Sequence, residues 1–189
     1  ASKATSYMVE SLIMGPEIFL FANRAKPLYD LLEKPDENKE KIAKVAEGLK
    51  RASEAYFKDY SAATDEKIVA ALLKIYADKN SPAYYPEIYN EIQKKYKGDY
   101  SKFAAKMFQK TIFANQEELS KFLENPTLKA LQKDMAFQAA VDIIGKYRDI
   151  SKEQAAGGQE LAKGRRLFVA GLMEMNPDKN YSNTLNLYS

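Results

Sequence analysis

The most informative segment of this chain is Gly164-Arg165-Arg166-Leu167-Phe168-Val169-Ala170-Gly171-Leu172-Met173-Glu174-Met175. It is too apolar to be the exposed last helix of a small domain. At helical spacing, one stripe carries five side chains: Leu161, Arg165, Phe168, Leu172 and Met175. Leu167, Val169 and Met173 widen the apolar surface beyond an ordinary amphipathic face. The sequence therefore predicts that another domain covers this helix.

The residues after this helix predict an exit from the domain. Asn176-Pro177 is a helix stop, because proline cannot continue a helix. Residues 184–188 alternate like a short strand, with no second strand nearby to pair with. We expect residues 1–175 to form one α-helical domain, and residues 176–189 to form a turn and the start of a connection to a β-domain.

Helical periodicity recurs along most of residues 1–175. One long stripe is spaced by three and four residues and holds Ile42, Val45, Leu49, Ala52, Tyr56 and Tyr60. A second helix is expected to start at Thr64-Asp65-Glu66 and to bury Ile68, Ala71, Leu72, Ile75 and Tyr76. The pattern predicts an all-α, irregular bundle of about seven to nine helices, with no repeat of the length found in solenoids.

Helix boundaries follow from capping residues. Asp99 is expected to cap one helix, and Asn115 with Glu118 resembles a capping box. Pro126 is expected at the first position of a helix that continues toward Tyr147. Ser151 is expected to cap the final helix, in which Gly157-Gly158 introduces a weak point.

Composition excludes several classes of function. The chain has 189 residues, enough for one domain with a core, and its net charge of +3 comes from interleaved basic and acidic residues, which argues against nucleic acid as a partner. No apolar run is long enough to span a membrane. The chain has no Cys and no His, so disulfides, His-based catalytic triads and His-ligated zinc sites are excluded. We predict no catalytic residue, metal site or cofactor within this chain.

Three features were weighed as sites. The tyrosines from Tyr84 to Tyr100 are either a ligand platform or, as we favour, the rim of a core. Arg165 and Arg166 either pair with a carboxylate at a domain interface, which we favour, or lie in solvent or touch a ligand. Residues 176–182 start like a calcium loop, but Tyr181 stands where glycine is needed, which favours a simple turn.

Several segments resemble one known family in their order and spacing. They are Tyr56-Phe57-Lys58-Asp59-Tyr60, Ala70-Ala71-Leu72-Leu73, Tyr96-Lys97-Gly98-Asp99-Tyr100, Phe122-Leu123-Glu124-Asn125-Pro126, and residues 165–175 with Pro177-Asp178-Lys179. Together they are similar to the helical domain of bacterial dipeptidyl peptidases of the dipeptidyl peptidase 7 and 11 family.

This resemblance implies a serine exopeptidase that releases dipeptides from peptide N-termini, built from a chymotrypsin-like double β-barrel with an inserted helical domain. In that family the catalytic His and Asp precede the helical domain and the Ser follows it, so none of the three maps onto this chain. The resemblance also implies a periplasmic or cell-surface location in a Gram-negative bacterium, and a homodimer for the full enzyme.

The leading hypothesis is a helical lid that covers and shapes the substrate cleft and is inactive by itself. Its partners would be the catalytic β-barrel of the same polypeptide, through Arg165, Arg166, Phe168, Leu172 and Met175, and the peptide substrate. One alternative is a free-standing helical interaction module that holds a partner protein. A third hypothesis is an enzyme that uses pairs of Asp and Glu, although acids interleaved with lysines on helices usually face water.

Overall fold

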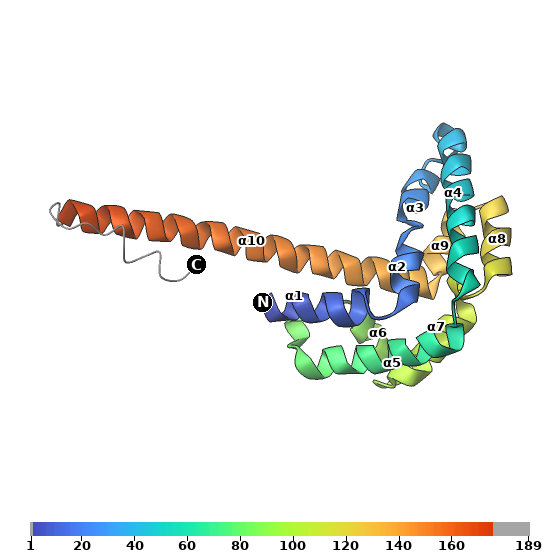
Figure 1. Ribbon diagram of the computed structural model, residues 1–189, viewed down its shortest axis with the longest axis horizontal. Coiled ribbons are helices and arrows are strands. Elements are labelled where there is room, and N and C mark those ends of the chain that lie inside the picture. The colour runs from blue at the N-terminus through green and yellow to red at the C-terminus, as the bar shows by residue number, and fades with distance from the viewer. Residues whose placement is uncertain (1, 176–189) are drawn as a thin grey trace. The chain divides into compact units, whose positions relative to one another are not determined.

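The computed structural model describes the backbone of residues 2–175 and the side chains of residues 5–167. The turn and connection expected at residues 176–189 lie outside the described residues. All regular structure in residues 2–175 is helical, which confirms the prediction of an all-α, multi-helix domain (Figure 1). The chain divides into two units, residues 1–148 and residues 149–189.

The first unit contains nearly all of the helices. In chain order the longer elements are α1 (Ser2–Tyr7), the π-helix η1 (Met8–Ile13), α2 (Glu17–Asn23), α3 (Lys26–Leu32), α4 (Lys39–Lys58), α5 (Ala62–Lys79), α6 (Ile88–Tyr96), α7 (Tyr100–Lys110), α8 (Gln116–Glu124), α9 (Leu128–Lys133) and α10 (Met135–Met175). Single turns of 3-10 helix join some of them: η2 (Pro35–Glu37), η3 (Pro82–Tyr84) and η4 (Ile112–Ala114). Only the first residues of α10 belong to this unit.

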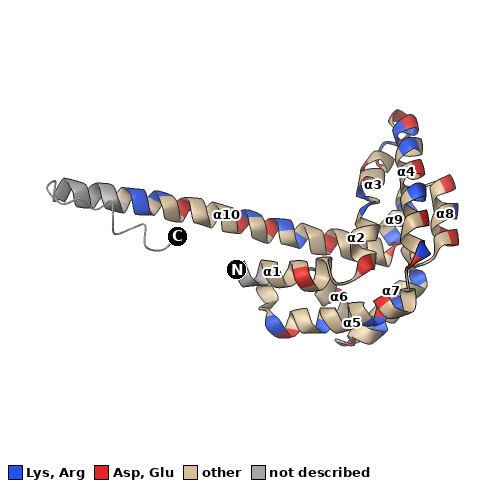
Figure 2. Ribbon diagram, in the orientation of Figure 1, with Lys and Arg blue, Asp and Glu red and all other residues tan. Residues whose placement is uncertain are grey.

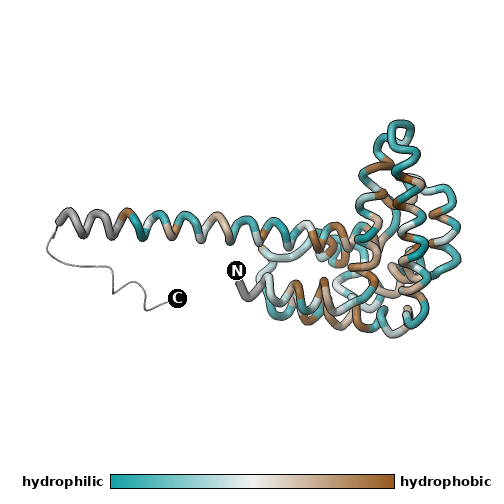
Figure 3. The backbone as a smooth tube through the Cα atoms, turned by 45° about the horizontal axis from the view of Figure 1, so that its top comes forward, coloured by the Kyte–Doolittle hydropathy of each residue, from teal (hydrophilic) through white to brown (hydrophobic). Residues whose placement is uncertain are grey.

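The core of the first unit is rich in phenylalanine. Phe19, Phe103, Phe113 and Phe137 are almost fully buried. The Phe113 ring lies 6.1 Å from that of Phe21 and 6.5 Å from that of Phe137, so η4 joins α2 to the start of α10. Figure 3 shows apolar residues concentrated where the helices of this unit meet. Charged residues of both signs are interleaved along most of the longer helices, as the sequence predicted, although α7 carries lysines alone (Figure 2).

Two short helices receive their N-terminal caps from distant parts of the chain. Neither Pro16, before α2, nor Glu87, before α6, caps its helix with a side chain. The Asp65 carboxylate accepts hydrogen bonds from the N–H groups of Glu17 (3.1 Å) and Ile18 (2.9 Å). Asp142 accepts from Glu87 and Ile88 in the same way. Each carboxylate thus satisfies amides that the first turn of a helix leaves unpaired, at the positive end of the helix dipole.

Asp134 connects two elements at once. Its carboxylate accepts hydrogen bonds from Phe137 N–H (2.9 Å) in its own helix, and from Ile112 N–H (2.9 Å) and Thr111 Oγ1 (2.8 Å) at the start of η4. The residue is 4% exposed. Burial raises the pKa of the Asp134 carboxyl above its ordinary value, while the hydrogen bonds from Phe137, Ile112 and Thr111 act in the opposite direction.

The buried face predicted for α5 was right at Tyr76 but wrong at Ile68, Ala71 and Ile75. Asp65, Val69, Leu73 and Tyr76 are buried, whereas Ile68 and Ile75 are 36% and 45% exposed and Ala71 is also exposed. Both stripes have helical spacing, so the apolar pattern alone does not choose between them. The choice follows from Asp65, which must face α2 to cap it. The helix also starts earlier than expected, with Ser61 as its cap.

Two expected helix starts were also wrong, and two were right. Thr127 caps α9, so Pro126 lies outside the helix, and Asp134 separates α9 from α10. Ser151 and Gly157-Gly158 lie within α10, which continues through them. Asp99 and Asn115 cap α7 and α8 as predicted, accepting from Lys102 N–H (2.9 Å) and Glu118 N–H (3.1 Å). Local capping chemistry is therefore reliable where no distant group competes.

Gly15 lies in a tight approach between η1 and α5. A Cβ atom at this position would lie 2.3 Å from Leu72 Cδ1 and 2.7 Å from the backbone oxygen of Ser11. The Gly15→Ala variant is therefore expected to lose about 1–3 kcal/mol of unfolding free energy, because the backbone atom cannot move aside. Gly48→Ala is the matched control, since a Cβ there meets nothing within 4 Å. Replacing this glycine within α4 is expected to gain about 0.5–1 kcal/mol. Urea unfolding of both variants measures the difference, and equal stabilities would contradict the prediction.

Candidate functional site

The residues predicted to contact another domain lie in the second unit, on α10. Arg165 and Arg166 are exposed, and Arg166 Nε donates to the carbonyl of Ala162 (3.4 Å). The neighbouring apolar side chains Leu161 and Leu167 are 59% and 65% exposed. Phe168, Leu172 and Met175 are helical, but their side chains lie outside the described residues. An interdomain role for these five residues stays a prediction.

The tyrosine region is part of the core rather than an open platform. The hydroxyl of Tyr89 donates to Leu73 O (2.7 Å), that of Tyr76 to Tyr84 O (2.8 Å), and that of Tyr85 to Ala77 O (2.6 Å). Tyr76 and Tyr89 are 1% and 7% exposed, and burial raises the pKa of both phenols well above the ordinary value. These hydroxyls hold the end of α5 against the segment that follows it.

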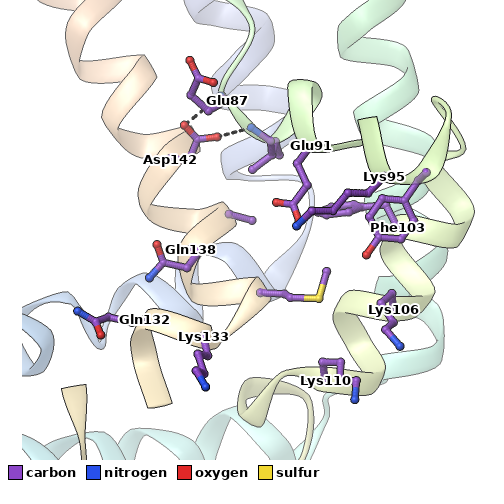
Figure 4. A pocket seen from close by; sticks show the side chains of 14 residues that line it. Glu87, Glu91, Lys95, Phe103, Lys106, Lys110, Gln132, Lys133, Gln138 and Asp142 are labelled. Atoms are coloured by element: carbon purple, nitrogen blue, oxygen red, sulfur yellow. Dashed lines mark hydrogen bonds and ion pairs between the residues drawn. The ribbon is translucent and has the colours of Figure 1, made fainter. Parts of the chain in front are cut away.

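A groove of about 740 Å³ lies between α6, α7, α9 and the start of α10 (Figure 4). All of its residues belong to the first unit: Glu87, Ile88, Glu91, Lys95, Tyr96, Phe103, Lys106, Lys110, Gln132, Lys133, Met135, Gln138, Ala139 and Asp142. This volume is within the range of small-molecule and peptide sites.

The apolar part of the groove comes from three elements. Ile88, Phe103 and Ala139 are buried, while Tyr96 and Met135 are half-buried. The rings of Tyr96 and Phe103 meet edge to face at 5.6 Å, which fixes α6 against α7. Tyr96 and Met135 therefore form the accessible apolar surface of the groove, and the buried Ile88, Phe103 and Ala139 support it from below.

One side of the groove is acidic. Asp142 accepts from Glu87 N–H (3.1 Å) and Ile88 N–H (2.8 Å). Burial raises the pKa of Asp142, and the two N–H groups lower it. The Glu87 carboxylate accepts from Asn90 Nδ2 (2.9 Å), and Glu91 pairs with Lys95 at 2.9 Å. The carboxylates on this side therefore already have protein partners.

The other side of the groove is basic. Figure 4 shows Lys106, Lys110 and Lys133 along one side of the opening, and Glu87 and Asp142 on the opposite side. Within the described part of the chain, none of these three lysines forms an ion pair. Gln138 lies beside them, with its amide donating to Leu131 O (3.0 Å). The basic side is thus a set of cations without protein counter-ions.

The chain has no His or Cys, and the described side chains of residues 5–167 include no group of three acidic residues placed to hold a metal ion. No helix among these residues is long and apolar enough to cross a membrane.

Sequence reasoning missed this groove, because its residues come from four elements between Glu87 and Asp142. One signal was present in α7, which carries Lys102, Lys106 and Lys110 at four-residue spacing and no acidic residue.

Comparison with known proteins supports the family suggested by the sequence. The sequence profile of the family Peptidase S46 matches residues 1–184. Dipeptidyl-peptidase 7 of Porphyromonas gingivalis is 30% identical over 184 residues, which make up 95% of this chain and 24% of that protein. The Asp/Glu-specific dipeptidyl-peptidase of Porphyromonas endodontalis is 27% identical over 183 residues, with 96% and 25% coverage.

The fold agrees with these sequence matches. The crystal structure of Porphyromonas endodontalis DPP11 is similar with a TM-score of 0.66 at 25% identity, over 91% of this chain and 24% of that one. The chain thus spans about a quarter of the length of the relatives that it matches. With nearly its whole length matched by the family profile, the chain belongs to the peptidase S46 family.

Proposed function

We propose that this chain is the helical lid of a dipeptidyl peptidase, and that it covers and shapes the substrate cleft of a catalytic domain on the same polypeptide. The observation that carries the proposal is the match of nearly the whole chain to about a quarter of relatives that are named dipeptidyl peptidases. The chain has no histidine, so the histidine of a serine-peptidase triad would have to come from the rest of the polypeptide. Lid motions of this kind gate substrate entry and product release.

The surface from Leu161 to Met175 is the proposed contact with the catalytic domain. The proposal is supported by the exposure of Leu161 and Leu167 beside two neighbouring arginines. Exposed apolar side chains next to arginine are typical of an interface. Arg165, Arg166, Phe168, Leu172 and Met175 would then be buried in the whole enzyme. A location in the periplasm or at the cell surface and a homodimer of the whole enzyme are further parts of this proposal.

The test compares this chain with the longer polypeptide that its gene encodes. Both are incubated with peptides of defined sequence, and the products are identified by mass spectrometry. We expect the longer polypeptide to release dipeptides from N-termini and the 189-residue chain to release none. Release of dipeptides by the chain alone would refute an inactive lid.

A free-standing interaction module is the second candidate, favoured by the same exposed side chains, Leu161 and Leu167. The two functions predict different sequences on either side of these residues in the gene. β-rich sequence with a His and an Asp upstream and a Ser downstream supports the lid. A reading frame confined to these residues would instead leave a separate partner protein as the occupant of the surface.

A further inference from the structure

We propose that the groove between α6, α7, α9 and the start of α10 binds a peptide segment that carries acidic side chains next to an apolar one. The proposal concerns the first unit alone and does not depend on the lid function, because the groove is complete within residues 87–142.

The carboxylates of the ligand would bind the basic side. Lys106 and Lys110 lie one turn apart on α7, and Lys133 is the last residue of α9. A lysine in the last turn of a helix interacts favourably with the helix dipole, which accounts for Lys110 and Lys133 individually. It does not account for three unpaired ammonium groups, including Lys106, at the edge of one groove. Neighbouring like charges repel one another, and an acidic ligand would remove that repulsion.

The apolar side chain of the ligand would bind between α6, α7 and α10. Tyr96 and Met135 are the half-buried apolar side chains at this surface, and the Phe103 ring, which is 1% exposed, supports Tyr96 edge to face from below. Methionine adapts its shape to a range of ligand side chains. At about 740 Å³ the groove accommodates several residues of an extended peptide, and a single small anion would leave this apolar surface unused.

The acidic side selects a peptide over a nucleic acid. A nucleic acid strand carries a phosphate at every nucleotide, so its backbone would also pass the carboxylates of Glu87, Glu91 and Asp142. A peptide can place its carboxylates beside the lysines and its neutral amides on the other side. The arrangement of acidic and basic side chains around the groove therefore favours a peptide in which the acidic residues are grouped.

The test is fluorescence anisotropy with the 189-residue chain and a fluorescein-labelled peptide, Asp-Asp-Leu-Glu-Glu. We expect saturable binding that weakens as the salt concentration rises, because salt screens exposed charges. The K106E/K110E variant is expected to bind roughly tenfold more weakly or worse, since two attractions become repulsions. K133E, on a different helix, is expected to weaken binding in the same direction. A peptide with Gly in place of Leu is expected to bind more weakly to the unaltered chain.

The matched control is K41E/K44E. Lys41 and Lys44 are exposed lysines on α4 without an ion pair in the described residues, and they lie outside the groove. This variant changes the net charge by the same amount, so it is expected to keep the affinity within about twofold, apart from long-range screening effects. Circular dichroism shows whether each variant is folded.

Three results would overturn the proposal. The first is the absence of saturable binding of the acidic peptide. The second is an equal loss of affinity in K106E/K110E and K41E/K44E, which would make the attraction a property of net charge. The third is a single-stranded oligonucleotide that competes more strongly than the acidic peptide and loses its affinity in K106E/K110E, which would assign the lysines to phosphate groups. None of these results bears on whether the longer polypeptide releases dipeptides.

Discussion

Asp134→Ala is expected to lower the free energy of unfolding by about 3–5 kcal/mol, because three hydrogen-bond donors lose their shared acceptor at once. The carboxylate accepts from Phe137 N–H, Ile112 N–H and Thr111 Oγ1 and is 4% exposed. Alanine would leave these donors buried without a partner, and each such group costs about 1–3 kcal/mol. The substitution would remove the cap of α10 and, at the same time, the hydrogen bonds that hold Thr111 and Ile112 at the start of η4.

Equilibrium unfolding in urea measures this effect. Asp78→Ala is the control, because Asp78 forms an exposed ion pair with Lys74 (2.6 Å), and exposed pairs of this kind contribute little to stability. Asp134→Asn keeps the shape and one acceptor oxygen, so its loss should fall between the two. A loss of less than about 1 kcal/mol for Asp134→Ala would show that water replaces the carboxylate at this site.

The second large effect is unfolding at alkaline pH. Burial raises the pKa of the Tyr76 and Tyr89 phenols far above their ordinary value near 10. The folded chain keeps both phenols neutral, whereas the unfolded chain loses both protons above pH 10. The stabilisation from the neutral phenols is therefore complete below pH 10 and is lost as the pH rises above it. Each phenol should cost about 1.4 kcal/mol per pH unit, so these two contribute about 3 kcal/mol per unit. Burial also raises the pKa of Tyr56 and Tyr60, which makes the total slope steeper.

Urea unfolding at pH 8, 10 and 11 tests this slope, and the phenolate absorbance near the unfolding pH should rise together with the loss of helical circular dichroism. Tyr89→Phe removes one titrating group. It should be less stable at pH 8 by about 1 kcal/mol, because the hydrogen bond to Leu73 O is lost, but its stability should fall less steeply above pH 10. A slope above pH 10 that is the same in Tyr89→Phe and in the unaltered chain would contradict the prediction.

The sequence predicted the fold class and the family but only part of the packing. Asp99 and Asn115 were identified because their caps are made within three residues. Asp65 was expected to serve its own helix, yet it serves α2, whose N–H groups are more than 40 residues away in the chain. Spacing alone therefore gave α5 the wrong buried face, since a stripe through Ile68 and Ile75 is as regular as the one through Val69 and Tyr76.

The groove could not be predicted for a related reason. Its acidic and basic sides come from helices that no sequence motif connects, and each lysine alone is typical of a solvated helix surface. What the sequence offered was the unbalanced charge of α7, with three lysines and no acidic residue. Only the folded structure places Lys133 and Asp142 around the same opening.

The distant caps on α2 and α6 also bear on how this domain folds. Helices of seven and nine residues are too short to persist alone in water, where about 12–15 residues are needed even for good helix formers. The carboxylates that cap them belong to Asp65, which is 47 residues from Ile18, and to Asp142, which is 54 residues from Ile88. These caps form only after the distant segments have docked. The short helices therefore depend on contacts between residues far apart in the sequence, and such contacts slow folding. Opening of the start of α10, which carries Asp142, would therefore also expose the amides at the start of α6, so hydrogen exchange should report these two segments as one cooperative unit.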